Sequence, residues 1–316
     1  MDISVSIIIC TRNRADSLHL TLESIGKAIV PPGWNVELIL VDNGSTDSTE
    51  ATVASTKLPN LPIRYIREER KGKGYAYNTG MDAARGRVFL FTDDDVRVPI
   101  NWIEAMNRPV LEGKADAVQG GIRPAPHLER PWLTGMLRAW LAAVENPECP
   151  PEGVLVGANM SFASDVFAST GGFDPRLGPG AAGFYEDTLF GLVLKRAGKR
   201  ISYQPAISVE HHFDPNRLRL GYFIRIARRM AVSRAIMEKN LDPAGTHPSV
   251  LDLLPKLPGF AFRCVTQTLK FLTHRAPDTG FLWYYYQICL WMALRRRDSY
   301  VKIPDTARPS LAKVDP

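Results

Sequence analysis

The segment Arg87-Val-Phe-Leu-Phe-Thr-Asp-Asp-Asp-Val96 decides the fold, because a short apolar run ends abruptly in three acidic residues. A run of this length without polar alternation is typical of a strand buried on both faces of a parallel sheet. In such sheets ligands bind beyond the carboxyl ends of the strands. The acidic triplet that follows this strand is therefore the first candidate for a functional site.

Three further apolar runs precede this segment, and helical patterns separate them. We expect strands at Val5–Cys10, Val36–Val41 and Ile63–Ile66, and helices near Ala15–Lys27, after Ser45 and near Tyr75–Ala84. Strands that alternate with helices form right-handed βαβ units. The sequence therefore predicts an α/β fold of Rossmann-like type, with a mostly parallel sheet flanked by helices.

The rest of the chain divides by pattern into two parts. Proline-rich and glycine-rich loops, with short strands near Val154 and Ile201, indicate a mixed α and β region up to residue 216. Beyond it, helical patterns cover residues 219–240, 253–274 and 281–297. We expect a catalytic domain at 1–216, with halves at 1–110 and 111–216, and a basic, aromatic-rich helical extension at 217–316.

Positive charge is concentrated in that extension. Residues 217–302 contain 15 Lys and Arg against five Asp and Glu, whereas residues 1–216 contain 22 against 26. Such a surplus favours nucleic acid or an anionic membrane surface, and the extension carries no recognised nucleic-acid motif. Leu253–Phe262 and Phe281–Tyr286 place apolar and aromatic side chains near Arg295–Arg297, which favours docking on an anionic membrane. The alternative is that these helices pack on the protein or on a second subunit.

The sequence gives no sign of secretion or of a membrane span. The run Val5–Cys10 is too short for a secretory signal, and no window reaches the roughly 18 apolar residues of a spanning helix. Four distant cysteines, Cys10, Cys149, Cys264 and Cys289, are typical of reduced thiols. We expect a cytoplasmic protein, or one that is peripheral at the cytoplasmic face of the inner membrane.

The acidic triplet is suited to a divalent cation. Alternate residues of an extended segment point the same way, so Asp93 and Asp95 can share a face. Adjacent carboxylates repel one another, and hard oxygen ligands of this kind suit Mg²⁺ or Mn²⁺, which in turn bind phosphates. The alternative interpretation is a solvated acidic turn.

Polar residues also follow the first two expected strands. Asp42 can accept hydrogen bonds from a base or ribose, although Asn43-Gly44 would make a turn there in any case. Thr11 and Arg14 offer a hydroxyl and a guanidinium group to a nucleotide. Lys71-Gly-Lys-Gly74 lacks the spacing of a P-loop, and no G-x-G-x-x-G follows the first strand.

These segments, in this order, resemble glycosyltransferase family 2, whose members have the GT-A fold. The resemblance rests on Ser6–Arg14, Val41–Asp47, Ala76–Gly80 and Phe91–Val96, and continues through Gly157–Phe162, Gly171–Asp174, Tyr185–Asp187 and His211. It spans roughly residues 1–230. It implies sugar transfer, with inversion, from a nucleoside-diphosphate sugar to a hydroxyl of a glycan or lipid-linked acceptor, by family analogy in bacterial polysaccharide or glycolipid assembly.

The resemblance also implies roles for individual residues. Asp42 matches the family's base-binding acid with Thr11 and Arg14 beside it, and Asn78 joins the nucleotide-sugar contacts. Asp93 and Asp95 match the D-x-D motif, in which the last Asp binds metal and the first approaches ribose or metal. One departure is Asn43, where many relatives have a second Asp.

Asp187, within Glu186-Asp187, matches the family's catalytic base. An acceptor hydroxyl must lose its proton as it attacks, which requires a carboxylate within hydrogen-bonding reach. The alternative is an acidic pair that only favours the dipole at a helix N-terminus. His211 matches a metal ligand, with His212 in reserve, and Arg217, Arg228 and Arg229 can reach the diphosphate or the acceptor, or form a solvated helix face.

Two other functions compete with a metal-dependent transferase. One is a non-catalytic nucleotide-sugar-binding protein, which the presence of both the metal acids and the base disfavours. The other is a basic nucleic-acid-binding protein, which only the charge of the extension supports.

Overall fold

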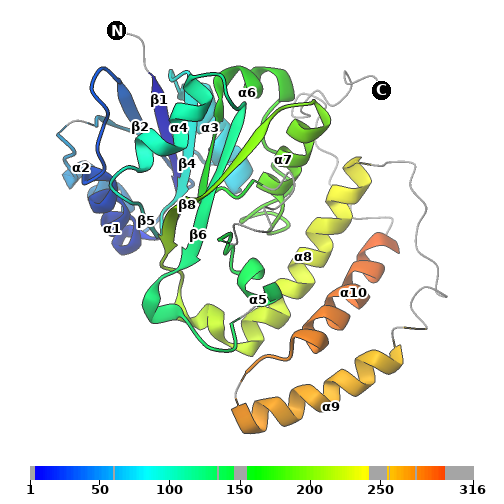
Figure 1. Cartoon of the computed structure of the whole chain (residues 1–316). Coiled ribbons are helices and arrows are strands. Elements are labelled where there is room, and N and C mark those ends of the chain that lie inside the picture. The colour runs from blue at the N-terminus through cyan, green and yellow to red at the C-terminus, as the bar shows by residue number, and fades with distance from the viewer. Residues whose placement is uncertain are drawn as a thin grey trace.

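An eight-stranded sheet with helices on both faces forms the centre of the structure (Figure 1). This computed structural model describes residues 4–59, 61–133, 135–145, 155–241, 255, 257–274 and 276–295. The strand order is β3-β2-β1-β4-β7-β6-β8-β5. Its strands are β1 (Val5–Thr11), β2 (Val36–Asp42), β3 (Ile63–Arg67), β4 (Val88–Asp93), β5 (Val96–Arg97), β6 (Ala117–Pro124), β7 (Asn159–Ala163) and β8 (Ile201–His211).

The first half of the sheet is parallel, as the sequence predicts. Strand β1 pairs in parallel with β2 and β4, and β2 pairs in parallel with β3. The helices between these strands are α1 (Ala15–Gly26), α2 (Thr49–Ser55) and α3 (Lys73–Ala83). Sequence periodicity thus located all four strands of this half and the helices between them to within a few residues.

The second half of the sheet is mixed and less predictable. Strand β7 runs antiparallel to β4 and β6, β6 runs parallel to β8, and the short β5 pairs antiparallel with β8. Sequence analysis did not predict β6 or β7, and its short strand near Ile201 is the 11-residue β8. The strand expected near Val154 lies outside the described residues.

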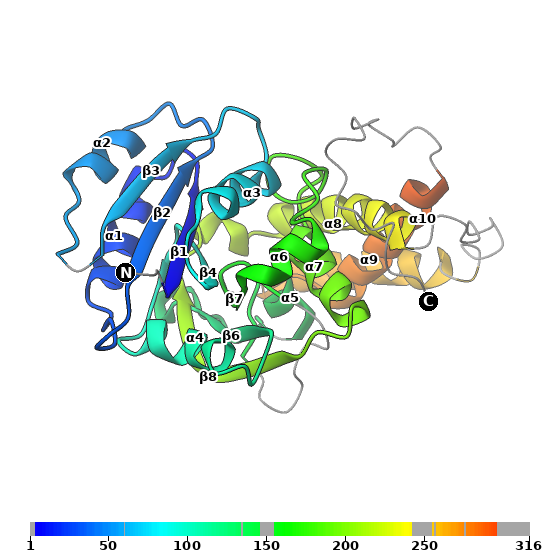
Figure 2. The same cartoon turned by 90° about the horizontal axis from the view of Figure 1, so that it is seen from above.

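The two faces of the sheet are covered by different helices (Figure 2). Residues such as Ile7 and Ile9 face α1, α2 and α4 (Trp102–Leu111), whereas Ile8 faces α3 and α7 (Glu186–Arg196). Neighbouring residues of a strand point to opposite faces, so a strand covered on both sides consists almost entirely of apolar residues. This layering explains why the apolar runs of the sequence show no alternation.

The parallel register brings the polar strand ends together. Thr11 on β1 is level with Asp42 on β2, and Cys10 is level with Asp93 on β4. These residues end their strands at the same edge of the sheet, and Asp94 and Asp95 follow directly. The fold therefore gathers the candidate site residues from three strands.

Shorter elements connect or follow the strands of the second half of the sheet. They are η1 (Pro126–Leu128), α5 (Gly135–Trp140), α6 (Ser164–Thr170) and η2 (Pro215–Leu218).

Three C-terminal helices follow the sheet, as the sequence predicts. Helix α10 (Thr279–Arg295) packs against α8 (Leu220–Leu241) and α9 (Leu257–His274), and α9 is the outermost of the three (Figure 1). Helix α8 is anchored on the catalytic part by Phe223, in one apolar cluster, and by Met237, in another. The proposed boundary after residue 216 remains a prediction.

The aromatic segments of α9 and α10 have different environments. On α10, Leu282 is buried and most of the aromatic residues are at least partly buried, so the packed-helix alternative describes most of this helix. On α9, Phe262 and Val265 are 64% and 59% exposed. Among the described residues, no helix is both long and apolar enough to cross a membrane. The described cysteines, Cys10, Cys264 and Cys289, form no disulfide.

Candidate active site

A cavity of about 360 Å³ opens at the carboxyl ends of β1 and β4. Its lining includes eight residues with predicted roles, namely Thr11, Arg14, Asp93, Asp95, Glu186, Asp187, His211 and Arg217. They come from the ends of β1 and β4 and the loops that follow, from the start of α7, from the end of β8 and from η2. Segments distant in the sequence therefore converge on one cavity.

The acidic triplet is held in place by cations and hydroxyl groups. One guanidinium nitrogen of Arg14 donates hydrogen bonds to Asp94, at 2.9 Å, and to Asp95, at 2.7 Å. The Thr11 hydroxyl donates to Asp94 at 2.7 Å. Burial raises the pKa of Asp94 to about 6, although Arg14 opposes this shift. The alternative of a solvated acidic turn is therefore wrong, because Asp94 and Asp95 are buried.

Asp95 and His211 form the most distinctive pair in the cavity. His211 Nε2 lies 3.3 Å from Asp95 Oδ1, and His211 Nδ1 lies 3.2 Å from the carbonyl oxygen of Leu141. Because a carbonyl can only accept, Nδ1 carries a proton, and when the ring is neutral the lone pair of Nε2 points toward Asp95. Asp95 Oδ1 is buried without a hydrogen-bond partner. Burial opposes the charge of Asp95, but His211, when its ring is protonated, together with Arg14 and Arg217 holds the pKa of Asp95 well below its usual range.

This pair fits a divalent cation that is completed by a ligand. A buried, orphaned carboxylate oxygen facing an imidazole lone pair is a donor set for Mg²⁺ or Mn²⁺, and Mg²⁺ commonly takes one or two carboxylates plus substrate phosphates. Within the described ranges, no group of three His, Cys, Asp or Glu side chains is arranged to hold a metal. Asp93, the third expected ligand, instead accepts from Lys73 Nζ at 2.6 Å.

Asp187 is oriented by backbone amides at the start of α7. Its Oδ2 accepts from the amide of Gly157 at 2.9 Å, and its Oδ1 accepts from the amide of Thr188 at 2.7 Å. Burial raises the pKa of Asp187 above its ordinary value, although both amides oppose the shift. A carboxylate fixed in this way, with a raised pKa, is suited to accept a proton.

Glu186, beside it, is buried and has a different environment. Burial and then the charge of Asp187 raise the pKa of Glu186 to about 8. The loop before α7 fits closely around this side chain, because a Cβ added to Gly178, where φ is +80°, would lie 2.7 Å from Glu186 Cδ. Tyr185 has φ of 74° directly before the helix, a conformation that costs a non-glycine residue about 1–3 kcal/mol. The surrounding packing therefore enforces the position of both acids.

Two predicted nucleotide contacts lie outside the cavity lining. Asp42 is fully buried, where it accepts from the Tyr65 hydroxyl at 2.7 Å and from the amide of Ser45 at 2.7 Å. Asn78 donates to the carbonyl of Phe173 and accepts from its amide, each at 2.9 Å. Asn78 therefore holds the loop at Phe173 in place. Asn43, which follows Asp42 in the sequence, lines the cavity.

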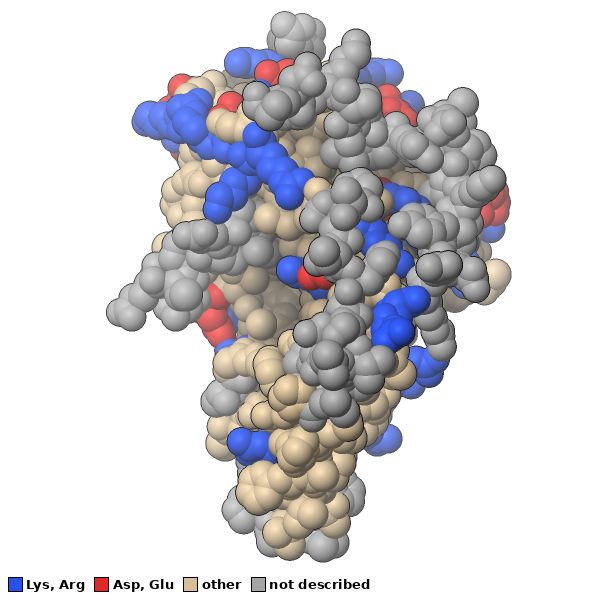
Figure 3. Space-filling model, turned by 90° about the vertical axis from the view of Figure 1, so that its right-hand side faces the viewer, with Lys and Arg blue, Asp and Glu red and all other residues tan. Residues whose placement is uncertain are grey.

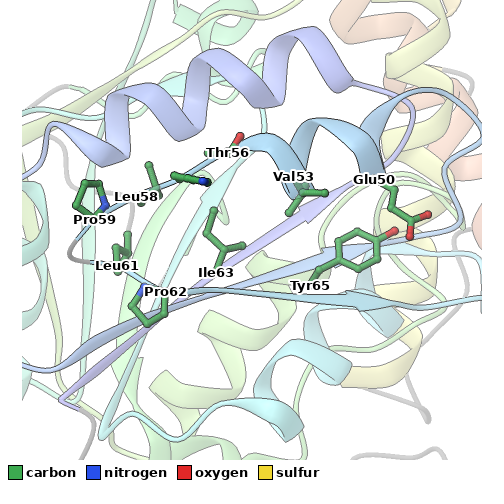
Figure 4. A pocket seen from close by; sticks show the side chains of 11 residues that line it. Glu50, Val53, Thr56, Leu58, Pro59, Leu61, Pro62, Ile63 and Tyr65 are labelled. Atoms are coloured by element: carbon green, nitrogen blue, oxygen red, sulfur yellow. The ribbon is translucent and has the colours of Figure 1, made fainter.

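Tyr65 belongs to a second cavity, of about 460 Å³, between α2 and β3 (Figure 4). The view shows Glu50 and Tyr65 at one end and two prolines at the other. The lining is mostly apolar and contains none of the predicted site residues. This cavity is therefore not the candidate active site.

Comparison with known proteins identifies the family. The family model described as Glycosyl transferase family 2 matches residues 6–168, which is more than half of the chain. The chain belongs to glycosyltransferase family 2. A glucosyl-dolichyl phosphate glucuronosyltransferase of Haloferax volcanii is 23% identical over 250 residues, covering 74% of this chain and 77% of the relative. The succinoglycan biosynthesis protein ExoO of Rhizobium meliloti is 38% identical over 96 residues, covering 29% of this chain and 26% of the relative.

Solved structures agree with this membership at the level of the fold. A mannosyltransferase from Pyrobaculum calidifontis, solved in complex with GDP-Man and Mn²⁺, matches with a TM-score of 0.63 at 19% identity. The match covers 93% of this chain and 87% of that structure. The glycosyltransferase therefore has the expected GT-A fold.

Sequence reasoning missed several residues that line the cavity of this glycosyltransferase. Lys73 was assigned no role, because Lys71-Gly-Lys-Gly74 lacks the P-loop spacing, yet its ammonium group pairs with Asp93. Burial opposes the charge of Lys73, but Asp93, Tyr77 and Glu186 together raise its pKa well above the usual value. Tyr222 also lines the cavity, from beyond the expected domain boundary, and it lies beside Arg217, which was expected to reach the diphosphate or the acceptor. Of the missed residues Lys73 and Tyr222, only Lys73 had a sequence signal, in its glycine-flanked basic motif.

The raised pKa of Glu186 predicts that the difference in stability between the wild type and Glu186→Gln depends on pH. The unfolded chain releases this proton near pH 4.5, whereas the folded protein holds it up to about pH 8. The stability that Glu186 contributes is therefore complete below pH 4.5 and is lost as the pH rises through 8. Glu186→Gln should become progressively more stable than the wild type between pH 5 and pH 8, measured by urea unfolding.

Glu50→Gln, which changes an exposed glutamate in the first turn of α2, is the matched control for this series. Its stability difference from the wild type should stay constant over the same pH range. A constant difference for Glu186→Gln as well would show that Glu186 ionises normally in the fold.

Proposed function

We propose that this family 2 enzyme is a metal-dependent, inverting glycosyltransferase that transfers sugar from a nucleoside-diphosphate sugar to an acceptor hydroxyl. One observation carries the proposal: the amide-bound carboxylate of Asp187 lines the same cavity as the Asp95–His211 pair. A proton acceptor and a cation-binding pair in one cavity are the two groups that such a displacement requires.

Asp187 acts as the general base in this proposal. Its carboxylate takes the proton of the acceptor hydroxyl while the hydroxyl oxygen attacks the anomeric carbon and the bond to the diphosphate breaks. The amides of Gly157 and Thr188 fix its orientation, and its raised pKa increases its basicity. One displacement inverts the anomeric centre, so no covalent intermediate on the enzyme is needed.

In this proposal the leaving diphosphate binds at the Asp95–His211 pair, which lines the same cavity. Asp95 and His211 would hold Mg²⁺ or Mn²⁺, which when bound supplies positive charge to the departing phosphates. Lys73 and Arg217 add fixed positive charge, since both line the cavity. Asp93 remains a prediction as a contact to ribose or metal, and Thr11, Arg14, Asp42 and Asn78 remain predictions as nucleotide contacts.

The relatives support a role in glycolipid or polysaccharide assembly. The Haloferax volcanii relative is named for a dolichyl phosphate-linked substrate, and the Rhizobium meliloti relative is named for succinoglycan biosynthesis. The mannosyltransferase structure contains GDP-Man and Mn²⁺. We therefore propose a glycan or lipid-linked acceptor and a donor of the nucleoside-diphosphate sugar class.

Asp187→Asn tests the base directly. A panel of UDP-, GDP- and dTDP-sugars, screened by thermal shift with Mn²⁺, first identifies the donor. The amide keeps the shape of the side chain and removes its basicity, so donor turnover should fall by about 10²-fold or more. The affinity for the nucleoside diphosphate should stay within a few-fold of the wild type, measured by calorimetry.

Asp165→Asn is a matched control, because Asp165 is an exposed acid in the first turn of another helix, α6. Its turnover should equal that of the wild type. Donor binding without any Mn²⁺-dependent turnover by the wild type would instead support a non-catalytic nucleotide-sugar-binding protein. If Asp187→Asn turned over donor at the wild-type rate, Asp187 would not be the base, and Glu186 would be the next candidate.

We further propose that α9 docks on an anionic membrane surface, at the cytoplasmic face. Phe262, Val265 and Leu269 follow helical spacing and are each more than half exposed, and Arg263 lies beside them. The lower end of the face in Figure 3, the level at which α9 lies in Figure 1, shows tan surface with scattered blue and no red. Exposed apolar side chains with nearby basic groups are typical of interfacial helices. Arg296 and Arg297, part of the predicted basic cluster, lie outside the described residues.

Phe262→Gln combined with Val265→Gln should weaken membrane binding. Removing two side chains that would enter the interface should lower co-sedimentation with phosphatidylglycerol vesicles by about tenfold at low salt. Ile29→Gln with Ile100→Gln is the matched control, because these residues are 54% and 61% exposed near the N-terminal half of the sheet. Equal losses in both variants, or no vesicle binding by the wild type, would contradict α9 docking.

A further inference from the structure

Three arginines line a third cavity, separate from the catalytic one. This cavity, of about 420 Å³, is formed by α8, by Tyr285 on α10 and by Ala182 in the loop before α7. Arg225, Arg228 and Arg229 all line it. Their spacing of three and four residues places them on one face of α8.

These arginines have no acidic partners in the part of the chain that the structure describes. None of the ion pairs found among those residues includes Arg225, Arg228 or Arg229, whereas Arg234 on the same helix pairs with Glu238 at 2.7 Å. Residues 220–232 contain no Asp or Glu. Three like charges on adjacent turns repel one another, so a bound anion would relieve that repulsion.

The arginine cavity adjoins the catalytic cavity, although no residue is common to the two linings. The loop residue Gly183 lines the catalytic cavity, and a Cβ there would lie 2.8 Å from Nε of Arg229. Tyr222 also lines the catalytic cavity, and the guanidinium group of Arg225 lies 5.7 Å from the centre of its ring. A ligand held by the arginines therefore lies just across the loop that leads to Asp187.

We propose that Arg225, Arg228 and Arg229 bind a terminal phosphate monoester carried by a lipid-linked acceptor. Guanidinium groups match the geometry of phosphate oxygens and can bind them in pairs of hydrogen bonds. Because the two cavities adjoin, one acceptor can place its terminal phosphate in this cavity and a separate hydroxyl near Asp187. The inference rests on the proposed function, and it assigns the acceptor to the class of lipid phosphates.

The occupant is distinguished from bulk anionic lipid by the form of its phosphate. A phosphate monoester carries about −1.5 to −2 charges near neutral pH and leaves three oxygens free for hydrogen bonds. The phosphodiester of an ordinary anionic phospholipid carries less charge and exposes fewer free oxygens. A site built for a lipid phosphate should prefer the monoester even when the total vesicle charge is equal.

The experiment uses the full chain and two kinds of phosphatidylcholine vesicle. One contains phosphatidic acid as the phosphate monoester probe, and the other contains enough phosphatidylglycerol to match its zeta potential. The wild type should bind the phosphatidic acid vesicles at least about fivefold more tightly, the order expected for paired charge-assisted hydrogen bonds. Arg225→Gln with Arg228→Gln should abolish that preference, and Arg225→Lys with Arg228→Lys should reduce it while keeping the charge.

Lys27→Gln with Lys57→Gln removes two exposed positive charges near the N-terminal half of the sheet and is the matched control. It should keep the full preference. No preference in the wild type, or equal losses in the control and in the arginine variants, would overturn the proposal. Donor turnover by the wild type, measured without lipid, tests the proposed function separately, so its failure is distinguishable from failure of the phosphate site.

Discussion

The site depends on the neutralisation of three adjacent carboxylates at the end of β4. Arg14 binds Asp94 and Asp95 from one side, and Lys73 binds Asp93 from another. Buried carboxylates without such partners would take up protons instead of remaining charged. These two cations come from the starts of α1 and α3, so the contacts of the triplet depend on how the parallel half of the sheet places these helices. One carboxylate oxygen, Asp95 Oδ1, is left without a hydrogen-bond partner.

The parallel half of the sheet could be predicted because its signals are local. Apolar runs such as Val5–Thr11 are buried along their whole length, so they need no information from distant residues. Strands β6 and β7 were missed for the opposite reason. Asn159 and Gln119 are buried polar residues there, and their side chains form hydrogen bonds with distant partners, including Asn159 with Trp102. Such pairing is decided by tertiary contacts and leaves no periodic pattern.

The candidate site was predicted in its residue types more than in its contacts. The convergence of Asp95, Asp187 and His211 on one cavity agrees with the prediction from ordered motifs. The orientation of the side chains could not be predicted from the sequence. Asn78 forms hydrogen bonds with the backbone of a loop, and Asp42 with Tyr65 and Ser45. A contact of Arg228 and Arg229 with the diphosphate or the acceptor was expected, but their cavity could not be predicted, because its walls come from α8, α10 and the loop before α7.

The central claim is that Asp95 and His211 form a cation site, and electron spin-echo spectroscopy tests it most directly. With Mn²⁺ and a nucleoside diphosphate bound, coordination by imidazole should give a ¹⁴N coupling to the metal. The account predicts this coupling in the wild type and in His212→Gln, and its loss in His211→Gln. Absence of the coupling in the wild type, or its persistence in His211→Gln, would contradict the account.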